Sequence, residues 1–284
     1  LKRYCFSNAD ANIEPFFISP KYFFKKIYLY LCSLIKNKMV LTIDVGNTRV
    51  KVAVIEKDMF LGFFSFLLEN FLPEMEKILN KYPLCQNLVL SSVGKLEEEQ
   101  IEWLQKKYNI LQISRETKFP FDNQYATPTT LGIDRMVLAA GAVLQFPSQN
   151  RLIIDVGTCV TYDFVDAQNV YYGGAISPGL RLRYESMHHY TAKLPLLELK
   201  EPAGLIGNST INSMHSGVVN GLQFEIDGYI DALIRTKGNF IIILTGGDAN
   251  FLAKRLKNTI FANSNFLLES LNRIYQYQIQ CLEK

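Results

Sequence analysis

The sequence lacks any run of about 18 consecutive apolar residues, the length that a membrane-spanning helix requires. It is also poor in cysteine, with five cysteines in 284 residues and no Cys-x-x-Cys pair. An odd number of widely spaced cysteines is typical of reduced thiols in a cytosolic protein. We therefore expect no membrane span, no disulfide framework and a cytoplasmic location.

A surplus of charge of one sign is likewise missing from most of the chain. Of the 30 Lys and Arg and the 27 Asp and Glu, residues 1–38 hold seven basic and two acidic residues, which leaves 23 basic and 25 acidic residues after them. This balance gives no reason to expect a nucleic-acid partner. The sequence also has no GxxxxGK[ST] motif, so a P-loop phosphate site is excluded.

Residues 1–38 differ in character from the rest of the chain. Their apolar centre, residues 27–35, has the length of a signal-peptide core, but a Lys-Asn-Lys triplet follows where a cleavage site would need small residues. A basic helix lying on a membrane surface is the alternative. We expect residues 1–38 to be a leader or upstream extension outside the fold, with Met39 as the working start.

A short motif occurs twice, as IDVGNT at residues 43–48 and as IDVGTC at residues 154–159. Each copy ends a run of branched apolar residues that is typical of a buried strand, and two further strand-like segments follow it. The predicted strands are residues 40–45, 49–56 and 59–66 in the first half and residues 151–156, 159–165 and 170–177 in the second. The repeat predicts two α/β halves, each opened by a three-stranded meander, whose turns face each other across a cleft.

Helix-like and strand-like segments continue in both halves. We expect helices at residues 73–82, 97–108, 132–146, 211–234, 248–256 and 264–279, and strands at residues 87–93 and 239–247. Loop-forming residues at 147–150 separate the halves. We therefore predict an N-terminal domain at residues 39–148 and a C-terminal domain at residues 149–284.

The two repeated turns have the residues that a phosphate site needs. Gly46 and Gly157 let the backbone turn tightly, so that N–H groups can point together at an anion. Asp44 and Asp155 repel a phosphate but can hold a cation that binds it. Short neutral donors and a point charge are added by the residues that follow, which are Asn47, Thr48, Lys51 and Thr158.

One Asp-x-Gly turn after a strand is a common way to end a strand and carries little information. Two copies between paired strands carry much more, and Gly246-Gly247 at the end of the predicted strand 239–247 allows a flat base or a ribose to approach the backbone. Together these features favour a site for the phosphates of ATP.

Four motifs resemble those of a known family. They are DVGNTRVK at 44–51, LGIDR at 131–135, DVGTCVTYD at 155–163 with GGAISPGL at 173–180, and GNSTINSMHSG at 207–217. The first and third are similar to signals of the acetate and sugar kinase, chaperone ATPase and actin superfamily. The GxDR motif and the glycine-rich third strand resemble type III pantothenate kinases, over about Met39 to Lys284.

The resemblance implies an α/β fold of two ribonuclease H-like, actin-like ATPase domains related by duplication. It also implies transfer of the γ-phosphate of ATP to the primary hydroxyl of pantothenate, the first step of coenzyme A synthesis. Members of the family are homodimers whose second subunit completes the substrate pocket. They use a monovalent cation, K⁺ or NH₄⁺, and Mg²⁺ with ATP.

By this resemblance the site residues fall into three sets. The implied ATP-binding residues are Asp44, Val45, Gly46, Asn47, Thr48, Arg49, Val50, Lys51 and Thr158. The implied pantothenate contacts are Tyr125, Gly132, Ile133, Asp134, Arg135 and Thr210. Asp134 is the implied base and Asp155 the implied ligand of the monovalent cation.

The chemistry of phosphoryl transfer agrees with the implied role of Asp134, because a positioned carboxylate can orient the attacking hydroxyl and accept its proton late. The alternative is that Asp134 only favours the positive end of its own helix. Phe121 is an alternative to Tyr125, and Cys159 stands where the family more often has a small nonpolar residue. Two other functions stay open: a kinase of this fold with a different acceptor, and a regulator that binds nucleotide without transferring phosphate.

Overall fold

A computed structural model describes residues 39–46, 49–91 and 96–282 of the chain. The predicted leader, residues 1–38, and the predicted ATP-binding residues Asn47 and Thr48 lie outside the described residues. The predicted boundary between a leader and the fold therefore stays a prediction.

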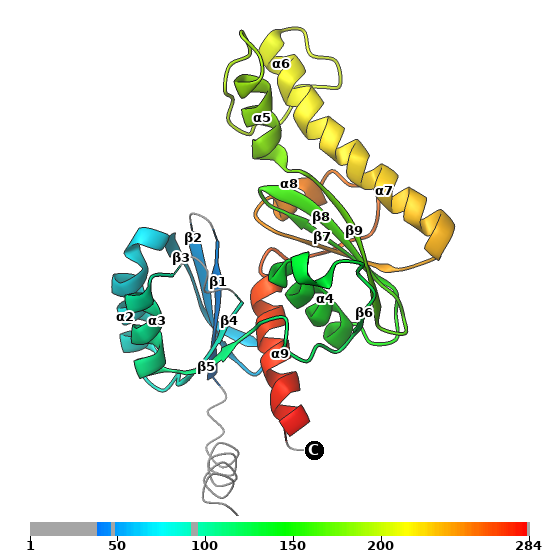
Figure 1. The fold of residues 1–284 in the computed structure, drawn as a ribbon. Coiled ribbons are helices and arrows are strands. Elements are labelled where there is room, and N and C mark those ends of the chain that lie inside the picture. Colours follow the sequence, from blue (N-terminus) through cyan, green and yellow to red (C-terminus); the bar gives the residue numbers. More distant parts are fainter. Residues whose placement is uncertain (1–38, 47–48, 92–95, 283–284) are drawn as a thin grey trace, which may run out of the picture. The chain divides into compact units, whose positions relative to one another are not determined.

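The first half forms a five-stranded sheet in the order β3-β2-β1-β4-β5 (Figure 1). Its strands are β1 (Met39–Val45), β2 (Arg49–Glu56), β3 (Met59–Leu67), β4 (Asn87–Leu90) and β5 (Asn109–Gln112). The first three strands form the predicted antiparallel meander, and β4 and β5 run parallel to β1. One face is covered by α2 (Phe71–Lys81) and α3 (Glu98–Lys107), with the short helix η1 (Leu68–Asn70) leading into α2.

The second half repeats this plan in a six-stranded sheet with the order β11-β10-β7-β8-β9-β6. Its strands are β6 (Asp122–Asn123), β7 (Arg151–Val156), β8 (Cys159–Val165), β9 (Val170–Pro178), β10 (Ile241–Thr245) and β11 (Phe261–Ala262). The meander β7-β8-β9 is antiparallel, and β10 and β11 lie parallel to β7 on its other side. The meander followed by parallel strands is thus duplicated, as the repeated motif predicts.

The helices of the second half are η2 (Pro128–Thr130), α4 (Ile133–Gln145), α5 (Leu180–His189), α6 (Thr210–His215), η3 (Ser216–Asn220), α7 (Gly221–Lys237), α8 (Ala249–Ala253) and α9 (Phe266–Leu282). Apolar side chains of α5, α7 and α8 pack on one face of the second sheet. Helix α4 packs on the other face, and α4 and α9 together cover the free face of the first sheet. The α4/α9 layer is therefore shared by the two sheets.

The predicted long helix at 211–234 is confirmed, since residues 210–237 are helical throughout, but a π-helical turn, η3, separates its α-helical parts α6 and α7. The hydroxyl of Ser216 donates to the carbonyl of Leu205 at 2.5 Å, and the amide of Asn220 donates to Ser216 at 3.1 Å. These bonds tie the turn to a distant loop, and such tertiary partners are absent from the helical periodicity of the sequence.

The domain boundary at residues 148 and 149 stays a prediction. Strand β6 precedes this boundary, yet it pairs in parallel with β9 of the second sheet. Within the described ranges, no helix is both long and apolar enough to cross a membrane.

Candidate functional site

The alternation of side chains along β1 and β2 sends the acidic turn of the first half toward the α4/α9 layer. Val45 and Val50 point into the core beneath α2 and α3. Asp44 and its cross-strand partner Lys51 therefore point to the opposite face, because successive residues of a strand face opposite sides. Both side chains lie at the end of the hairpin and are half-buried.

The second turn is oriented in the same way. Ile153 of β7 packs against α4, so Asp155, two residues later, faces the same layer. Asp155 pairs across the sheet with Thr161 of β8 and with Thr245 of β10. The two repeated carboxylates thus both face the helix layer that the sheets share.

Asp134 occupies the first turn of α4, which begins after Gly132. Its side chain is exposed, and one carboxylate oxygen accepts the backbone N–H of Arg135 at 2.9 Å. Gly132 has no side chain to cap the helix, so the exposed carboxylate and the N–H groups of the first turn share the same end of α4.

The three carboxylates act on one another. The pKa of Asp155 is raised to about 7, first by burial and next by the negative charge of Asp134. The positive charge of Lys51 opposes this rise, and the charge of Asp44 adds to it. The structure therefore brings Asp44, Lys51, Asp134 and Asp155 from two sheets and one helix into a single electrostatic group.

The glycine amides of the two turns are used inside the turns. The N–H of Gly46 donates to the carbonyl of Arg49 at 3.0 Å, and the N–H of Gly157 donates to that of Cys159 at 2.9 Å. A phosphate would consequently be met by the groups that come next in the turn. In the second turn this is the exposed residue Thr158, and the corresponding residues of the first turn lie outside the described residues.

The end of β10 closes against the second turn. Gly246 has a φ of +97°, and a Cβ atom there would lie 2.4 Å from a carboxylate oxygen of Asp155. Only glycine fits at this approach. The N–H of Asp248 donates to the carbonyl of Val156 at 3.2 Å, which fixes the Gly-Gly segment beside Asp155.

A cavity of about 210 Å³ opens next to this segment. Its lining includes Leu180 and Tyr184 of α5, Leu197 of the loop that follows α5, and Asp248. Burial raises the pKa of the Asp248 carboxyl. The remaining lining includes the charged side chains of Arg181, Glu185 and Glu198, so the cavity is not a purely apolar slot, and the placement of a base near Gly246 and Gly247 stays a prediction.

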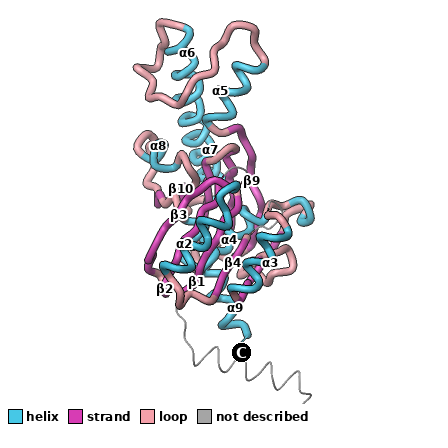
Figure 2. The backbone as a smooth tube through the Cα atoms, turned by 90° about the vertical axis from the view of Figure 1, so that its left-hand side faces the viewer, coloured by secondary structure: helices cyan, strands magenta, loops and turns pink. Residues whose placement is uncertain are grey.

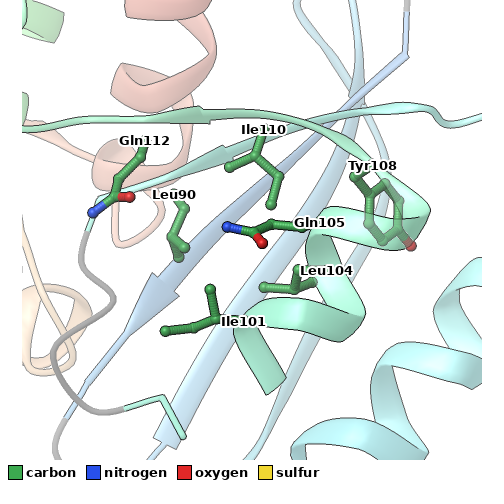
Figure 3. A pocket seen from close by; sticks show the side chains of 7 residues that line it. All are labelled: Leu90, Ile101, Leu104, Gln105, Tyr108, Ile110 and Gln112. Carbon is green, nitrogen blue, oxygen red and sulfur yellow. The ribbon is translucent and has the colours of Figure 1, made fainter. Parts of the chain in front are cut away.

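A second cavity, of about 310 Å³, lies in the first half between α3 and the strands β4 and β5 (Figure 3). Apolar side chains and the amides of Gln105 and Gln112 line it. It contains none of the predicted site residues and no charged side chain, so it lacks the groups that phosphoryl transfer needs.

Two arginines among the predicted site residues have partners within the fold. The guanidinium of Arg49 donates to the hydroxyl and the carbonyl of Ser65 at 3.1 Å each. Arg135 is buried, and its Nε and Nη2 atoms donate to the carboxylate of Asp163 at 3.0 and 2.6 Å. Sequence reasoning missed Asp163 as a partner, although it is the last residue of the DVGTCVTYD motif.

Tyr125 lies with the GIDR segment, and Thr210 does not. The guanidinium carbon of Arg135 is 5.5 Å from the centre of the Tyr125 ring. Phe121, the alternative, stacks instead on Phe119 at 5.4 Å. Thr210 is the exposed first residue of α6, which both views show beyond the second sheet and away from α4 (Figures 1 and 2).

The carboxylates of Asp44, Asp134 and Asp155 carry negative charge that would attract a cation, but they do not form a complete metal-binding site. Among the residues that the structure describes, no cluster of three or more His, Cys, Asp or Glu could hold a metal ion by itself. Burial is the largest cause of the raised pKa of Asp155, and the charges of Asp134 and Asp44 add to it against the charge of Lys51.

The chain matches the type III pantothenate kinase family over residues 40–232. A type III pantothenate kinase of Flavobacterium psychrophilum is 66% identical over 240 residues, which cover 84% of this chain and 100% of the relative. One of Flavobacterium johnsoniae is 61% identical over 241 residues, which cover 85% of this chain and 99% of the relative. One of Christiangramia forsetii is 46% identical over 239 residues, with 84% and 98% covered.

Solved structures share the fold at low sequence identity. A protein from Campylobacter jejuni assigned to the Baf family of transcriptional activators has a TM-score of 0.56 at 20% identity, covering 84% of this chain and 99% of its own. A ROK hexokinase from Thermus thermophilus has a TM-score of 0.50 at 9% identity, covering 86% and 99%. The predicted fold class, two α/β domains of the actin-like ATPase type, is confirmed. Because the family model matches well over half of the chain and these relatives cover 84–85% of it, this chain belongs to the type III pantothenate kinase family.

Proposed function

We propose that this chain transfers the γ-phosphate of ATP to the primary hydroxyl of pantothenate, with Asp134 as the base. The observation that carries the proposal is the convergence of Asp44, Asp134 and Asp155 with Lys51 at the shared helix layer. A kinase needs an acceptor-orienting carboxylate next to a phosphate site, and this group combines both.

In the reaction, the oxygen of the pantothenate hydroxyl attacks the γ-phosphorus while the bond from that phosphorus to the β–γ bridging oxygen breaks. The Asp134 carboxylate orients the hydroxyl and accepts its proton, and ADP leaves with the bridging oxygen. Lys51 and the donors of the turn at Thr158 stabilise the charge of the phosphates. Mg²⁺ that accompanies ATP supplies further neutralisation of the β- and γ-phosphates when bound.

The monovalent cation, K⁺ or NH₄⁺, is assigned to Asp155. This assignment rests on the surplus of negative charge around its half-buried carboxylate, which a bound cation relieves. The Gly246-Gly247 segment and the neighbouring cavity are assigned to the ribose and base of ATP. The pantothenate is assigned to the side of Asp134 where Gly132, Ile133 and Tyr125 lie.

The active form is proposed to be a homodimer. Thr210, an implied pantothenate contact, lies on α6 and does not join Asp134 within one chain (Figures 1 and 2). The segment between α5 and α6 exposes large apolar side chains, with Tyr190 82% and Ile206 91% exposed. A second copy that covers these side chains would bring its own Thr210 to the pocket, since apolar surface of this kind marks interfaces.

The test is ATP-dependent phosphorylation of pantothenate by the purified chain, followed by mass spectrometry of the product, in K⁺ and in Na⁺. Asp134→Asn should lower kcat by about 100-fold or more and leave ATP binding within about twofold, because general-base positioning contributes on that scale. Near-normal turnover of Asp134→Asn would remove the assigned base. An acceptor panel of sugars and acetate tests the alternative kinase, and absence of any transfer despite ATP binding would favour the regulator.

A further inference from the structure

We propose that Asp163 is a positioning residue for this reaction, which orients both the Asp134 carboxylate and the Tyr125 ring through its ion pair with Arg135. The inference rests on the proposed function and adds a residue that does not itself touch substrate. Its starting point is the buried network at the centre of β8.

The Asp163 carboxylate has no exposed surface and accepts hydrogen bonds from two side chains. Arg135 donates Nε at 3.0 Å and Nη2 at 2.6 Å to Oδ1, and Nε also lies 3.1 Å from Oδ2. The hydroxyl of Tyr171 donates to Oδ1 at 2.6 Å. A buried ion pair gives little net stability over an apolar pair of the same size, so we infer that its value here is the fixed geometry.

The geometry is transmitted to Asp134 through helix α4. Neighbouring residues of an α-helix point about 100° apart around the axis, since the helix has about 3.6 residues per turn. Anchoring Arg135 inside the second half therefore sets the rotation of the first turn, and with it the direction in which Asp134 points. No side chain caps α4 at Gly132, so the ion pair of Arg135 is one of the contacts that fix the start of the helix.

The same ion pair supports Tyr125. The Arg135 guanidinium lies over the Tyr125 ring at 5.5 Å, a distance at which a cation is attracted to an aromatic face. The ring also lies against Gly173, whose φ is +84° and where a Cβ atom would come within 2.6 Å of the ring. Tyr125 therefore contacts both the backbone of β9 and the guanidinium that Asp163 anchors.

The nucleotide side of the site depends on Asp163 far less. Its charge contributes to the raised pKa of Asp155 only as the smallest of the named influences, behind those of Asp134, Lys51 and Asp44. Loss of the network should consequently raise the KM for pantothenate and lower kcat, and it should leave the Kd of ATP almost unchanged. If Asp163 only stabilised the fold, its loss would instead weaken the binding of ATP and of pantothenate together.

The primary variant is Asp163→Asn, which keeps the shape and removes the charge. We expect kcat to fall about tenfold or more and the KM for pantothenate to rise several-fold, because small misplacements of a reacting group are costly. The Kd of ATP, measured by calorimetry without pantothenate, should change by less than about twofold.

Asp163→Asn leaves a buried guanidinium without its counter-charge and can fail to fold. Tyr171→Phe is therefore the second variant, since it removes one hydrogen bond from Asp163 and no charge. Its matched control is Tyr162→Phe. Tyr162 is equally buried, precedes Asp163 on β8, points to the opposite face of the sheet and donates to Glu225 at 3.0 Å. For Tyr171→Phe we expect kcat to fall about threefold or more with ATP binding unchanged, and for the control less than about a 1.5-fold change.

The inference would be overturned if Tyr171→Phe and Tyr162→Phe lowered kcat equally while lowering Tm equally. A rise in the Kd of ATP that matches the rise in the KM for pantothenate would overturn it as well. Normal kinetics of a folded Asp163→Asn variant would do the same. Failure of the proposed function is separately visible, because the unaltered chain would then not phosphorylate pantothenate at all.

Discussion

The raised pKa of Asp155 predicts that the proposed binding of a monovalent cation at this residue depends on pH. Burial and the charges of Asp134 and Asp44 raise this pKa to about 7, against the opposing charge of Lys51. A cation binds the ionised carboxylate, so a proton competes with it. With a pKa of about 7, about one tenth of the carboxyl is ionised at pH 6 and about nine tenths at pH 8. The apparent affinity for K⁺ should therefore rise about tenfold between these two values.

The assay is the Tm of the chain without ATP or pantothenate, titrated with KCl against choline chloride at constant ionic strength. A ligand that binds only the folded state raises stability by RT ln(1 + [L]/Kd), so Tm stays level below Kd and rises with the logarithm of the K⁺ concentration above it, and a fit of this curve gives the affinity. Asp155→Asn should abolish the response to K⁺. Asp248→Asn is the matched control, because Asp248 is also an acidic residue with a raised pKa but is not assigned to the cation.

The sign of the effect without K⁺ follows from the same pKa. A carboxyl whose pKa is higher in the folded than in the unfolded state stabilises the fold while it is protonated, and this stability is lost as pH rises from about 4 to about 7. The loss amounts to at most about 4 kcal/mol, from a shift of about three units. Relative to Asp155→Asn, the unaltered chain should lose stability over this range. An equal fitted affinity for K⁺ at pH 6 and pH 8 would contradict this prediction.

Two further predictions concern the interior and the surface. A Cβ atom on Gly141 of α4 would lie 1.9 Å from the hydroxyl of Ser270 on α9, so Gly141→Ala should lower the free energy of unfolding by about 1–3 kcal/mol in a urea titration, and Ser270→Gly added to it should recover most of the loss. If adding Ser270→Gly did not restore the free energy of unfolding, the predicted clash between Gly141→Ala and Ser270 would not be the cause of the loss. Ile206→Asp should convert the proposed dimer into a monomer by light scattering and lower activity on pantothenate, whereas Leu84→Asp, at a 65% exposed residue of the first half, should do neither. A dimer unchanged by Ile206→Asp would place the interface elsewhere.

The strands of both meanders could be predicted closely from the sequence. Continuous apolar runs and period-two alternation placed β1, β2, β7 and β8 within one residue of their observed ends. These signals are local, because the alternation of a strand between two faces is written in adjacent residues. The duplicated motif likewise indicated that both halves share one plan, and the fold is confirmed by the family and by the solved structures.

Helical segments were predicted less well where their limits depend on distant partners. Helix α5 was missed. The predicted helix at 211–234 contains a π turn, and the hydroxyl of its first residue, Ser216, donates to the carbonyl of Leu205 in another segment. A hydrogen bond to another segment changes the backbone without changing the apolar period that a sequence pattern reports.

The sequence alone established which residues are acidic, which turns carry glycine and which segments form the strands that precede those turns. Only the tertiary structure decided that Asp44, Asp134 and Asp155 share one field, and that Arg135 turns inward to Asp163, 28 residues further along the chain. The reason is physical. A pKa and an ion pair depend on distances through space and on burial, and these exist only once both sheets have packed against α4 and α9.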